Sequence, residues 1–230
     1  MKGRVLILGG PGNGALVAHA IHDARARGGS EWEVAGYLND RLPVGEEVEG
    51  FPVRGSLAEV GRFLAEGFHF INTIYRIDGQ EERLALFEGL GIPDHRLATF
   101  VHPLAYVASN VVLGAGTVLL PGVAVSPGVT FGRGCLVLAG ATVAHNTVVG
   151  DYCHLAAQSA VGAHVALGRG VHVGLNASIR EGVRVGDGGA LGMGAVALED
   201  VGPGEVWVGV PARFLRRVRP GTGPPPSGNP

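Results

Sequence analysis

The chain has little of what several protein classes need. Only 2 of its 230 residues are cysteine, which excludes a disulfide framework. Charged residues make up 17% and the formal net charge is −2, so the chain lacks the basic surface of a nucleic-acid-binding protein. No apolar run approaches the ~18 residues of a membrane span, and the run at 5–8 is too short for a signal-peptide core. We expect a soluble, cytoplasmic protein with reduced thiols and with neither a nucleic-acid partner nor a membrane span.

Glycine is the residue that the chain has in excess. The sequence holds 40 Gly residues, against a typical usage of about 7%, and no Gly-X-Y period of the collagen type accompanies them. Apolar residues make up 46% of the chain, so its composition is globular rather than disordered. At about 100–200 residues per domain, the length allows one large domain or two small ones.

Residues 1–98 alternate between strand-like and helical segments. The expected strands lie at 5–8, 34–38, 70–74 and 97–101, and the expected helices at 15–27, 57–66 and 81–89. Strands that alternate with helices predict a small parallel α/β sheet of the Rossmann-like type. The segment is too short for a full six-strand dinucleotide-binding fold.

Residues 99–203 carry a six-residue repeat. Sixteen successive positions at steps of six are all large and apolar, for which the chance expectation is roughly one in 10⁵. They are Val101, Val107, Leu113, Leu119, Val125, Phe131, Val137, Val143, Val149, Leu155, Val161, Leu167, Val173, Ile179, Val185 and Leu191. Six-residue units are the signature of a parallel β-helix.

A second set of positions supports the repeat. Two residues before the large residue stands one no larger than valine, as at Cys135, Thr147 and Cys153. Residues two apart in a strand face the same side, so each unit places one large and one small side chain inward. Three units close a triangular coil of 18 residues. Sixteen units therefore predict about five coils, roughly 25 Å tall at ~4.8 Å per strand spacing, with both cysteines packed in the core.

The chain leaves the repeat in a C-terminal segment at 204–219. This segment contains the run Val208-Gly209-Val210-Pro211-Ala212-Arg213. A Pro/Gly-rich tail at 220–230 follows, which we predict to be disordered.

Four motifs together give the chain a family resemblance. They are the hexapeptide units ending in Val-Gly-Val-Pro-Ala-Arg, the Gly10-Pro11-Gly12-Asn13-Gly14 turn, the pair Asn39-Asp40 after the second strand, and His145 followed by His154. On these residues the chain resembles the sugar acyltransferases of the sialic acid O-acetyltransferase type, which include bacterial N-acetyltransferases of nucleotide-linked amino sugars. The resemblance covers about residues 3–217. It implies a left-handed β-helix that forms a homotrimer, binds acetyl-CoA between neighbouring columns and needs no metal.

The resemblance also implies roles for individual residues. His145 becomes the general base for acetyl transfer, with Asn146 beside it and His154 as a second active-site histidine. The residues expected to contact acetyl-CoA are Gly162, Gly174, Gly192, Gly194, Pro211 and Arg213. Those expected to contact the nucleotide sugar are Gly10, Gly12, Asn13, Gly14, Asn39 and Asp40. An imidazole suits the base because its ordinary pKa, about 6.5, lies near neutral pH.

The spacing of the two histidines predicts how the site is assembled. His145 and His154 are half a coil apart, so they lie on different sides of one column and converge only across a subunit boundary. Outward-facing Val118 and Leu136 would form an exposed apolar patch together with Val112 and Val148, and such patches mark interfaces. We therefore predict three composite sites, each with His145 from one chain and His154 from another. His172, one coil above His154, is expected at the surface, and lining of the groove between columns is the alternative for it.

Three departures from the family pattern keep other functions open. Asn13 and Asn146 stand where a histidine and an acidic residue are common, and Leu138 replaces a frequent asparagine, which suggests a less polar acceptor pocket. One alternative is a metal-dependent hydratase of the carbonic-anhydrase-like β-helix type, which needs three convergent histidines. The other is a β-helix scaffold without activity. N- and O-acetylation are both compatible with the sequence.

Overall fold

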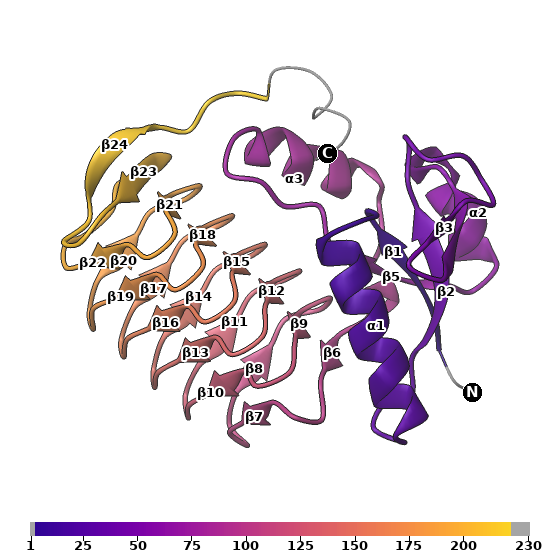
Figure 1. Cartoon of the computed structure of the whole chain (residues 1–230), viewed down its shortest axis with the longest axis horizontal. Coiled ribbons are helices and arrows are strands. Elements are labelled where there is room, and N and C mark those ends of the chain that lie inside the picture. Colours follow the sequence, from indigo (N-terminus) through magenta and orange to yellow (C-terminus); the bar gives the residue numbers. More distant parts are fainter. Residues whose placement is uncertain (1–2, 222–230) are drawn as a thin grey trace.

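The chain forms a small α/β domain followed by a column of stacked two-residue strands (Figure 1). The computed structural model describes residues 3–221. Most of the predicted disordered tail, 222–230, lies outside the described residues, whereas Gly221 is hydrogen-bonded to Glu82 of the α/β domain. Within 3–221, no helix has the length and apolar character needed to cross a membrane.

The sheet of the α/β domain has the strand order β3-β4-β2-β1-β5. Its strands are β1 (Arg4–Leu8), β2 (Glu33–Leu38), β3 (Glu47–Val48), β4 (Phe51–Gly55) and β5 (His69–Asn72). All neighbours are parallel except β3 and β4, so the sheet is mixed rather than purely parallel. The β3–β4 hairpin, which the sequence analysis missed, turns at Glu49 and Gly50 with positive φ angles of 49° and 80°. A glutamate in that conformation is not a turn signal that can be read from sequence.

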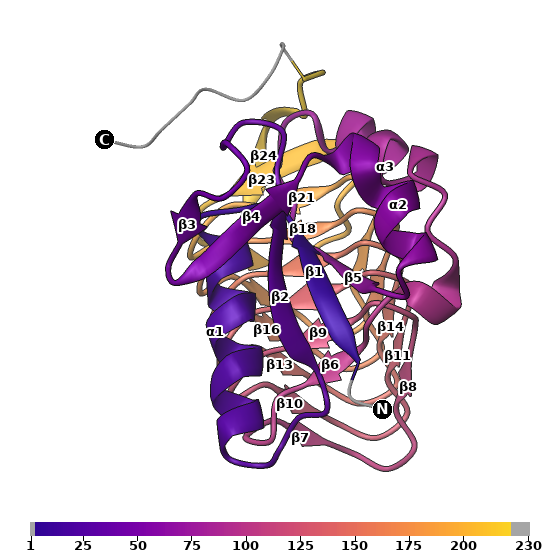
Figure 2. The same ribbon diagram turned by 90° about the vertical axis from the view of Figure 1, so that its right-hand side faces the viewer.

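Helices cover both faces of this sheet (Figure 2). They are α1 (Asn13–Ala26), α2 (Val60–Ala65) and α3 (Gln80–Gly89), with 3₁₀ turns η1 (Leu57–Glu59) and η2 (Asp94–Arg96). Helix α1 packs on Val5 and Ile7, whereas α2 and α3 pack on the alternate residues Leu6 and Leu8. The three predicted helices are confirmed.

The expected last strand at 97–101 was wrong as a single element of the sheet. Leu97 makes one parallel bridge to Phe70 of β5. The next strand, β6 (Phe100–Val101), already pairs with the column instead. The chain crosses from one part to the other within these five residues, so two different pairings share one apolar run.

The column is a three-sided parallel β-helix, as the six-residue repeat predicts. Its strands are β6 (Phe100–Val101), β7 (Tyr106–Val107), β8 (Val112–Leu113), β9 (Val118–Leu119), β10 (Ala124–Val125), β11 (Thr130–Phe131), β12 (Leu136–Val137), β13 (Thr142–Val143), β14 (Val148–Val149), β15 (His154–Leu155), β16 (Ala160–Val161), β17 (Ala166–Leu167), β18 (His172–Val173), β19 (Ser178–Ile179), β20 (Arg184–Val185), β21 (Ala190–Leu191) and β22 (Val196–Ala197). Each strand pairs with the one 18 residues on, as Leu136 does with His154. A hairpin of β23 (Glu205–Val208) and β24 (Arg213–Arg217) extends the sheet that begins with β6.

Three faces result, and each is named here by its first strand. The β6 face contains β9, β12, β15, β18 and β21, the β7 face contains β10, β13, β16, β19 and β22, and the β8 face contains β11, β14, β17 and β20. The second residue of each strand points into the core, together with the small residue two positions earlier. Buried Thr147 meets its hydrogen-bonding need by donating from Oγ1 to the Gly162 carbonyl, at 2.8 Å. Both cysteines are free and buried, in line with the predicted core packing.

The α/β domain sits on the β6 face of its own column. Val118 and Leu136 are fully buried there, in one cluster with α1 residues such as Val17 and Ile21. The predicted exposed patch is therefore wrong for these two residues, because the domain of the same chain covers them. Leu138 packs in the same cluster, so its replacement of a polar residue is explained by contact with the domain rather than by an acceptor pocket.

Glycine, which has no Cβ, is required at positions where one coil stacks closely on the next. A Cβ on Gly150 would lie 2.7 Å from the carbonyl carbon of Gly168, one coil above. We expect Gly150→Ala to lower the free energy of unfolding by about 1–3 kcal/mol, the usual cost of overpacking. Gly61→Ala is the matched control, because its Cβ would meet nothing within 4 Å and it lies inside α2, where alanine is favoured by about 0.5–1 kcal/mol. Urea denaturation measures both, and a Gly150→Ala midpoint at or above that of wild type would contradict this account of stacking.

Candidate active site

A cleft opens at the carboxyl ends of β1, β2 and β5. Its volume is about 980 Å³, and it is lined by the segments that follow these three strands, at 9–13, 38–42 and 73–76, and by the first turns of α3. Strand β1 lies between β2 and β5: the chain passes from β1 to β2 on one side, and after β4 it crosses to β5 on the other side. Ligands of open α/β sheets bind at this kind of switch point.

The glycine-rich turn after β1 gives the cleft an anion-binding wall. Gly12 is the N-cap of α1, has a φ of 84° and leaves the helix without a side-chain cap. The first N–H groups of a helix have no partner within the helix and attract negative charge. A Cβ on Gly10 would lie 2.7 Å from the Asn39 amide, so the glycine lets the two loops approach. Gly10, Gly12 and Asn13, which the resemblance places in the nucleotide-sugar site, all line the cleft.

Asn39 and Asp40 also line the cleft, but their side chains hold its loops together. The Asn39 Nδ2 donates to the Gly9 carbonyl at 3.0 Å, and its Oδ1 accepts from the N–H groups of Arg41 and Leu42. Asp40 Oδ1 accepts from the Leu57 N–H at 2.7 Å. Both residues therefore shape the site through the loops that they fix. Gly14 is buried in α1, against Tyr37 and Thr73, and lies outside the cleft lining.

Three arginines that the sequence analysis missed line the same cleft: Arg41, Arg76 and Arg83. Within residues 3–221, none of them forms an ion pair with a carboxylate. Burial and the nearby positive charge of Arg76 hold the pKa of Arg83 below its ordinary value. Arg41 and Arg76 follow the ends of β2 and β5, so their place at the carboxyl edge of the sheet was readable from the sequence. An excess of positive charge beside a helix N-terminus suits an anionic ligand.

His154 lies directly behind the inner end of the cleft. Asn13 Nδ2 is 3.4 Å from His154 Nε2, and the ring of Tyr75 stacks on the imidazole with centroids 5.3 Å apart. Asn13 and Tyr75 themselves line the cleft, and the Tyr75 hydroxyl donates to the Gly134 carbonyl of the column. His172 closes the group from the coil above, with its Nδ1 3.0 Å from His154 Nδ1. His172, expected at the surface, is half-buried, and its ring stacks on that of His154.

Both stacked imidazoles are neutral at pH 7. The pKa of His154 is lowered to about 3, mainly by burial and to a lesser extent by the charge of the neighbouring His172. Burial lowers the pKa of His172 to about 4. The Asn13 amide lies within hydrogen-bond distance of His154 Nε2, and His154 Nδ1 lies within hydrogen-bond distance of His172 Nδ1. The three side chains thus form one chain of hydrogen-bond contacts from the α/β domain through two coils of the column.

His145 lies in an exposed turn between β13 and β14. This turn is the corner between the β7 and β8 faces, opposite the β6 face that carries His154. Asn146 adopts a φ of 58°, and its amide nitrogen is 3.2 Å from His145 Nδ1. His164 packs edge-on against the imidazole from the coil above, with centroids 5.1 Å apart. Among residues 3–221, the two predicted catalytic histidines have no hydrogen-bond or ring-contact partner in common.

The residues predicted to bind acetyl-CoA lie in three places of one chain. Gly162 follows β16, in the same corner as His145, whereas Gly174, Gly192 and Gly194 follow strands of the β6 face. Coil stacking already requires Gly162, since a Cβ there would lie 2.6 Å from the Glu181 backbone nitrogen. Pro211 and Arg213 belong to the C-terminal hairpin, where Arg213 pairs with Glu199 at 3.5 Å.

The architecture has close counterparts among solved structures. The acetyltransferase domain of PglB from Neisseria gonorrhoeae, in complex with acetyl coenzyme A, is 27% identical with a TM-score of 0.79, over 94% of this chain and 100% of that one. A mutant of GDP-perosamine N-acetyltransferase from Caulobacter crescentus, in complex with CoA and GDP-perosamine, is also 27% identical with a TM-score of 0.79, over 94% and 98% of the two chains. This is the fold of the left-handed β-helix sugar acetyltransferases.

The resemblance drawn from the sequence is thereby confirmed, including the left-handed β-helix. WeeI from Acinetobacter baumannii, 22% identical with a TM-score of 0.61, over 92% of this chain and 99% of that one, adds a further instance of the fold. These structures support the expectation of an acyltransferase that uses acetyl-CoA. No family model matches the chain, and no curated protein matches it in sequence.

The two buried imidazoles make stability depend on pH. Their folded pKa values lie below the unfolded value of about 6.5, so the unfolded chain binds more protons once the pH falls below that value. Stability is therefore lost as the pH drops from about 6.5 towards 4, by on the order of 1 kcal/mol per pH unit for each imidazole. We expect the double variant His154→Asn, His172→Asn to flatten the slope of urea stability against pH in this range. His95→Asn, at an exposed position, is the control; equal slopes in both variants would contradict the assignment.

Proposed function

We propose that the protein transfers the acetyl group of acetyl-CoA to an amino group on a nucleotide-activated sugar. The observation that carries this proposal is the cleft in the α/β domain. The cleft offers a helix N-terminus and three arginines, and two of its lining residues, Asn13 and Tyr75, contact His154 of the column. A ligand with an anionic diphosphate and a sugar fits these groups. GDP-perosamine, bound in the structure of the Caulobacter enzyme, is of this kind.

The diphosphate of the nucleotide sugar would bind at the N-terminus of α1. Its backbone N–H groups and the arginines around the cleft supply donors and positive charge for the phosphate oxygens. Asn39 and Asp40 keep the neighbouring loop in place. The sugar would then lie towards Asn13, with its amino group directed at the reaction centre.

A trimer would complete the site. The exposed corner with His145 lies far from its own cleft in the arrangement of faces, so a second copy must supply it. Tyr106 on the β7 face and Val112 and Val148 on the β8 face are each more than half exposed, which supports contacts between columns. Acetyl-CoA would bind in the groove between two columns, with Gly162, Gly174, Gly192, Gly194, Pro211 and Arg213 as its contacts. Two free thiols are consistent with action in the cytoplasm.

His145 would act as the general base in this site. It removes a proton from the amine while the nitrogen attacks the thioester carbonyl, so that a C–N bond forms and a tetrahedral oxyanion results. Collapse breaks the C–S bond, and the CoA thiolate leaves with the proton returned by the imidazole. Rotation of the Asn146 amide by half a turn places Oδ1 against Nδ1–H and leaves Nε2 free to accept the proton.

No described feature favours the hydratase. In the part of the chain that the structure describes, no group of three or more His, Cys, Asp or Glu side chains could hold a metal ion. The scaffold alternative is separated from the enzyme by a direct assay for acetyl transfer.

Removal of the base should abolish most of the activity but not the binding of acetyl-CoA. We expect His145→Ala to lower kcat by about 10²–10⁴-fold, the usual worth of a general base. Thermal shift with acetyl-CoA should be unchanged, because the imidazole contributes to the chemical step rather than to the cofactor site. Coupled detection of released CoA thiol measures the rate with a panel of nucleotide amino sugars. Acetyl transfer at the wild-type rate in His145→Ala would contradict the role of His145 as the general base.

The composite site predicts that two inactive variants complement each other. We expect His145→Ala and His154→Ala chains to be inactive alone and to regain about a third of wild-type activity in mixed trimers, since one of the three sites then combines an intact corner from one variant with an intact cleft from the other. Co-expression with two affinity tags isolates the mixed assemblies. Each variant mixed with itself is the control. No recovery of activity in the mixed assemblies, or a monomer in light scattering, would contradict a site that takes His145 from one chain and His154 from another.

A further inference from the structure

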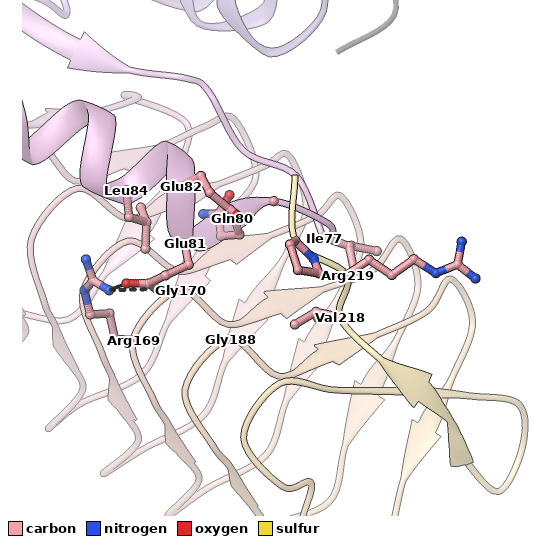
Figure 3. A pocket seen from close by; sticks show the side chains of 12 residues that line it. Ile77, Gln80, Glu81, Glu82, Leu84, Arg169, Gly170, Gly188, Val218 and Arg219 are labelled. Atoms are coloured by element: carbon pink, nitrogen blue, oxygen red, sulfur yellow. Dashed lines mark hydrogen bonds and ion pairs between the residues drawn. The ribbon is translucent and has the colours of Figure 1, made fainter. Parts of the chain in front are cut away.

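The C-terminal segment returns to the cleft after it leaves the column. From β24 the chain runs back to the start of α3, where Val218 and Arg219 lie beside Ile77 and Gln80 (Figure 3). We call residues 216–221 the C-terminal strap. Gly221 at its end lines the proposed nucleotide-sugar cleft. The strap is therefore the one described part of the C-terminal region that reaches this cleft.

Five hydrogen bonds hold the strap, four on the loop before α3 and one on the first turn of α3. The Arg216 guanidinium makes a bidentate contact with the Asp78 carboxylate, donating from Nη1 to Oδ1 at 2.8 Å and from Nη2 to Oδ2 at 2.9 Å. The Arg219 N–H also donates to Asp78 Oδ1, and its carbonyl accepts from the Gly79 N–H at 3.0 Å. Gly221 N–H donates to Glu82 at 2.9 Å. The bond from Arg216 holds the pKa of Asp78 below its ordinary value, so this carboxylate is ionised at neutral pH.

The same loop is the support of a cleft arginine. Arg83 Nη1 donates to the carbonyl of Asp78 at 3.0 Å and to that of Gly79 at 2.7 Å. The backbone at 78–79 thus lies between two partners, with the strap on one side and Arg83 on the other. A Cβ on Gly79 would lie 2.8 Å from the Gly221 Cα, so the contact with the strap is close. Whatever fixes this backbone also fixes the guanidinium that faces the cleft.

We infer that the strap is part of the ligand site and that Arg216 and Asp78 are positioning residues for Arg83. Docked, the strap fixes the carbonyls that hold Arg83 and closes the cleft wall at Gly221, which favours the binding of a diphosphate. This inference rests on the proposed function of the cleft. Its effect is local, because the apolar clusters that stabilise the domain and the column include no strap residue.

The neighbouring residue provides a matched control. Arg217 directs its guanidinium the other way, to the Pro203 carbonyl and to Glu205 of the hairpin. Arg216→Gln and Arg217→Gln therefore remove the same charge from adjacent positions, and only the first loses the contact with Asp78. Asp78→Asn tests the contact from its other side.

The experiment measures binding of UDP, GDP and dTDP to the full chain by titration calorimetry, beside binding of acetyl-CoA. For the nucleotide that wild type binds best, we expect Arg216→Gln and Asp78→Asn each to weaken affinity about tenfold, the scale of a small misplacement of a binding group. The double variant should lose no more than either single one, because both changes break one contact. The nucleotide affinity of Arg216→Lys should lie between those of wild type and Arg216→Gln, since lysine keeps the charge but cannot form the two parallel hydrogen bonds to Asp78. Acetyl-CoA affinity and melting temperature should match those of Arg217→Gln.

Other outcomes overturn the inference in distinguishable ways. Equal nucleotide affinities in Arg216→Gln and Arg217→Gln would remove the strap from the site and leave the proposed function standing. Equal losses of nucleotide affinity, acetyl-CoA affinity and melting temperature in Arg216→Gln would make the strap a general stabilising element instead. Failure of wild type to bind any of the three nucleotides, while it binds acetyl-CoA, would overturn both this inference and the proposed substrate class.

Discussion

Parallel pairing at a fixed separation of 18 residues is the constraint on which the rest of the structure depends. Each two-residue strand pairs with the strand one coil above and one coil below, so outward side chains fall into vertical rows. One such row on the β6 face consists of Val118, Leu136, His154 and His172. Its lower part receives the α/β domain, and its upper part supplies the stacked imidazoles. One row of residues thus joins the domain to the column and carries the candidate site.

The architecture of the column was predictable because its signal is local and repeated. Large residues at every sixth position, and small ones two before them, leave little choice of strand register, and the structure follows it at each step. The sheet of the first domain was less predictable. Its β3–β4 hairpin is short and turns at Glu49, and the run at 97–101 divides between two sheets. In both places a contact distant in sequence overrides the local pattern.

The candidate site was predictable only in part, for a related reason. Its residue types could be read from motifs, but the burial of His154 depends on the packing of Tyr75 and Asn13 from the other domain. The same packing hides Val118 and Leu136, which by themselves resemble an oligomer surface. Arg83 was missed because it lies on α3, with no motif around it. Asn39 and Asp40 were found in the right place, and only the hydrogen bonds show that they act on the loops.

The anchoring of the α/β domain along the edge of the column restricts how this protein can change its length. Arg133 binds Asp94, and Arg169, two coils higher at the same corner, binds Glu81 and Glu88. Insertion or deletion of a single hexapeptide between these arginines would turn everything above it by about a third of a revolution and carry the upper anchor to another face. A whole coil keeps the angle but changes the height, and so separates the two anchors by about one strand spacing. Arg216 and Asp78 tie the far end of the column back to the same domain, so coils added above Arg169 would disturb this third anchor, and the number of coils is constrained along the whole column.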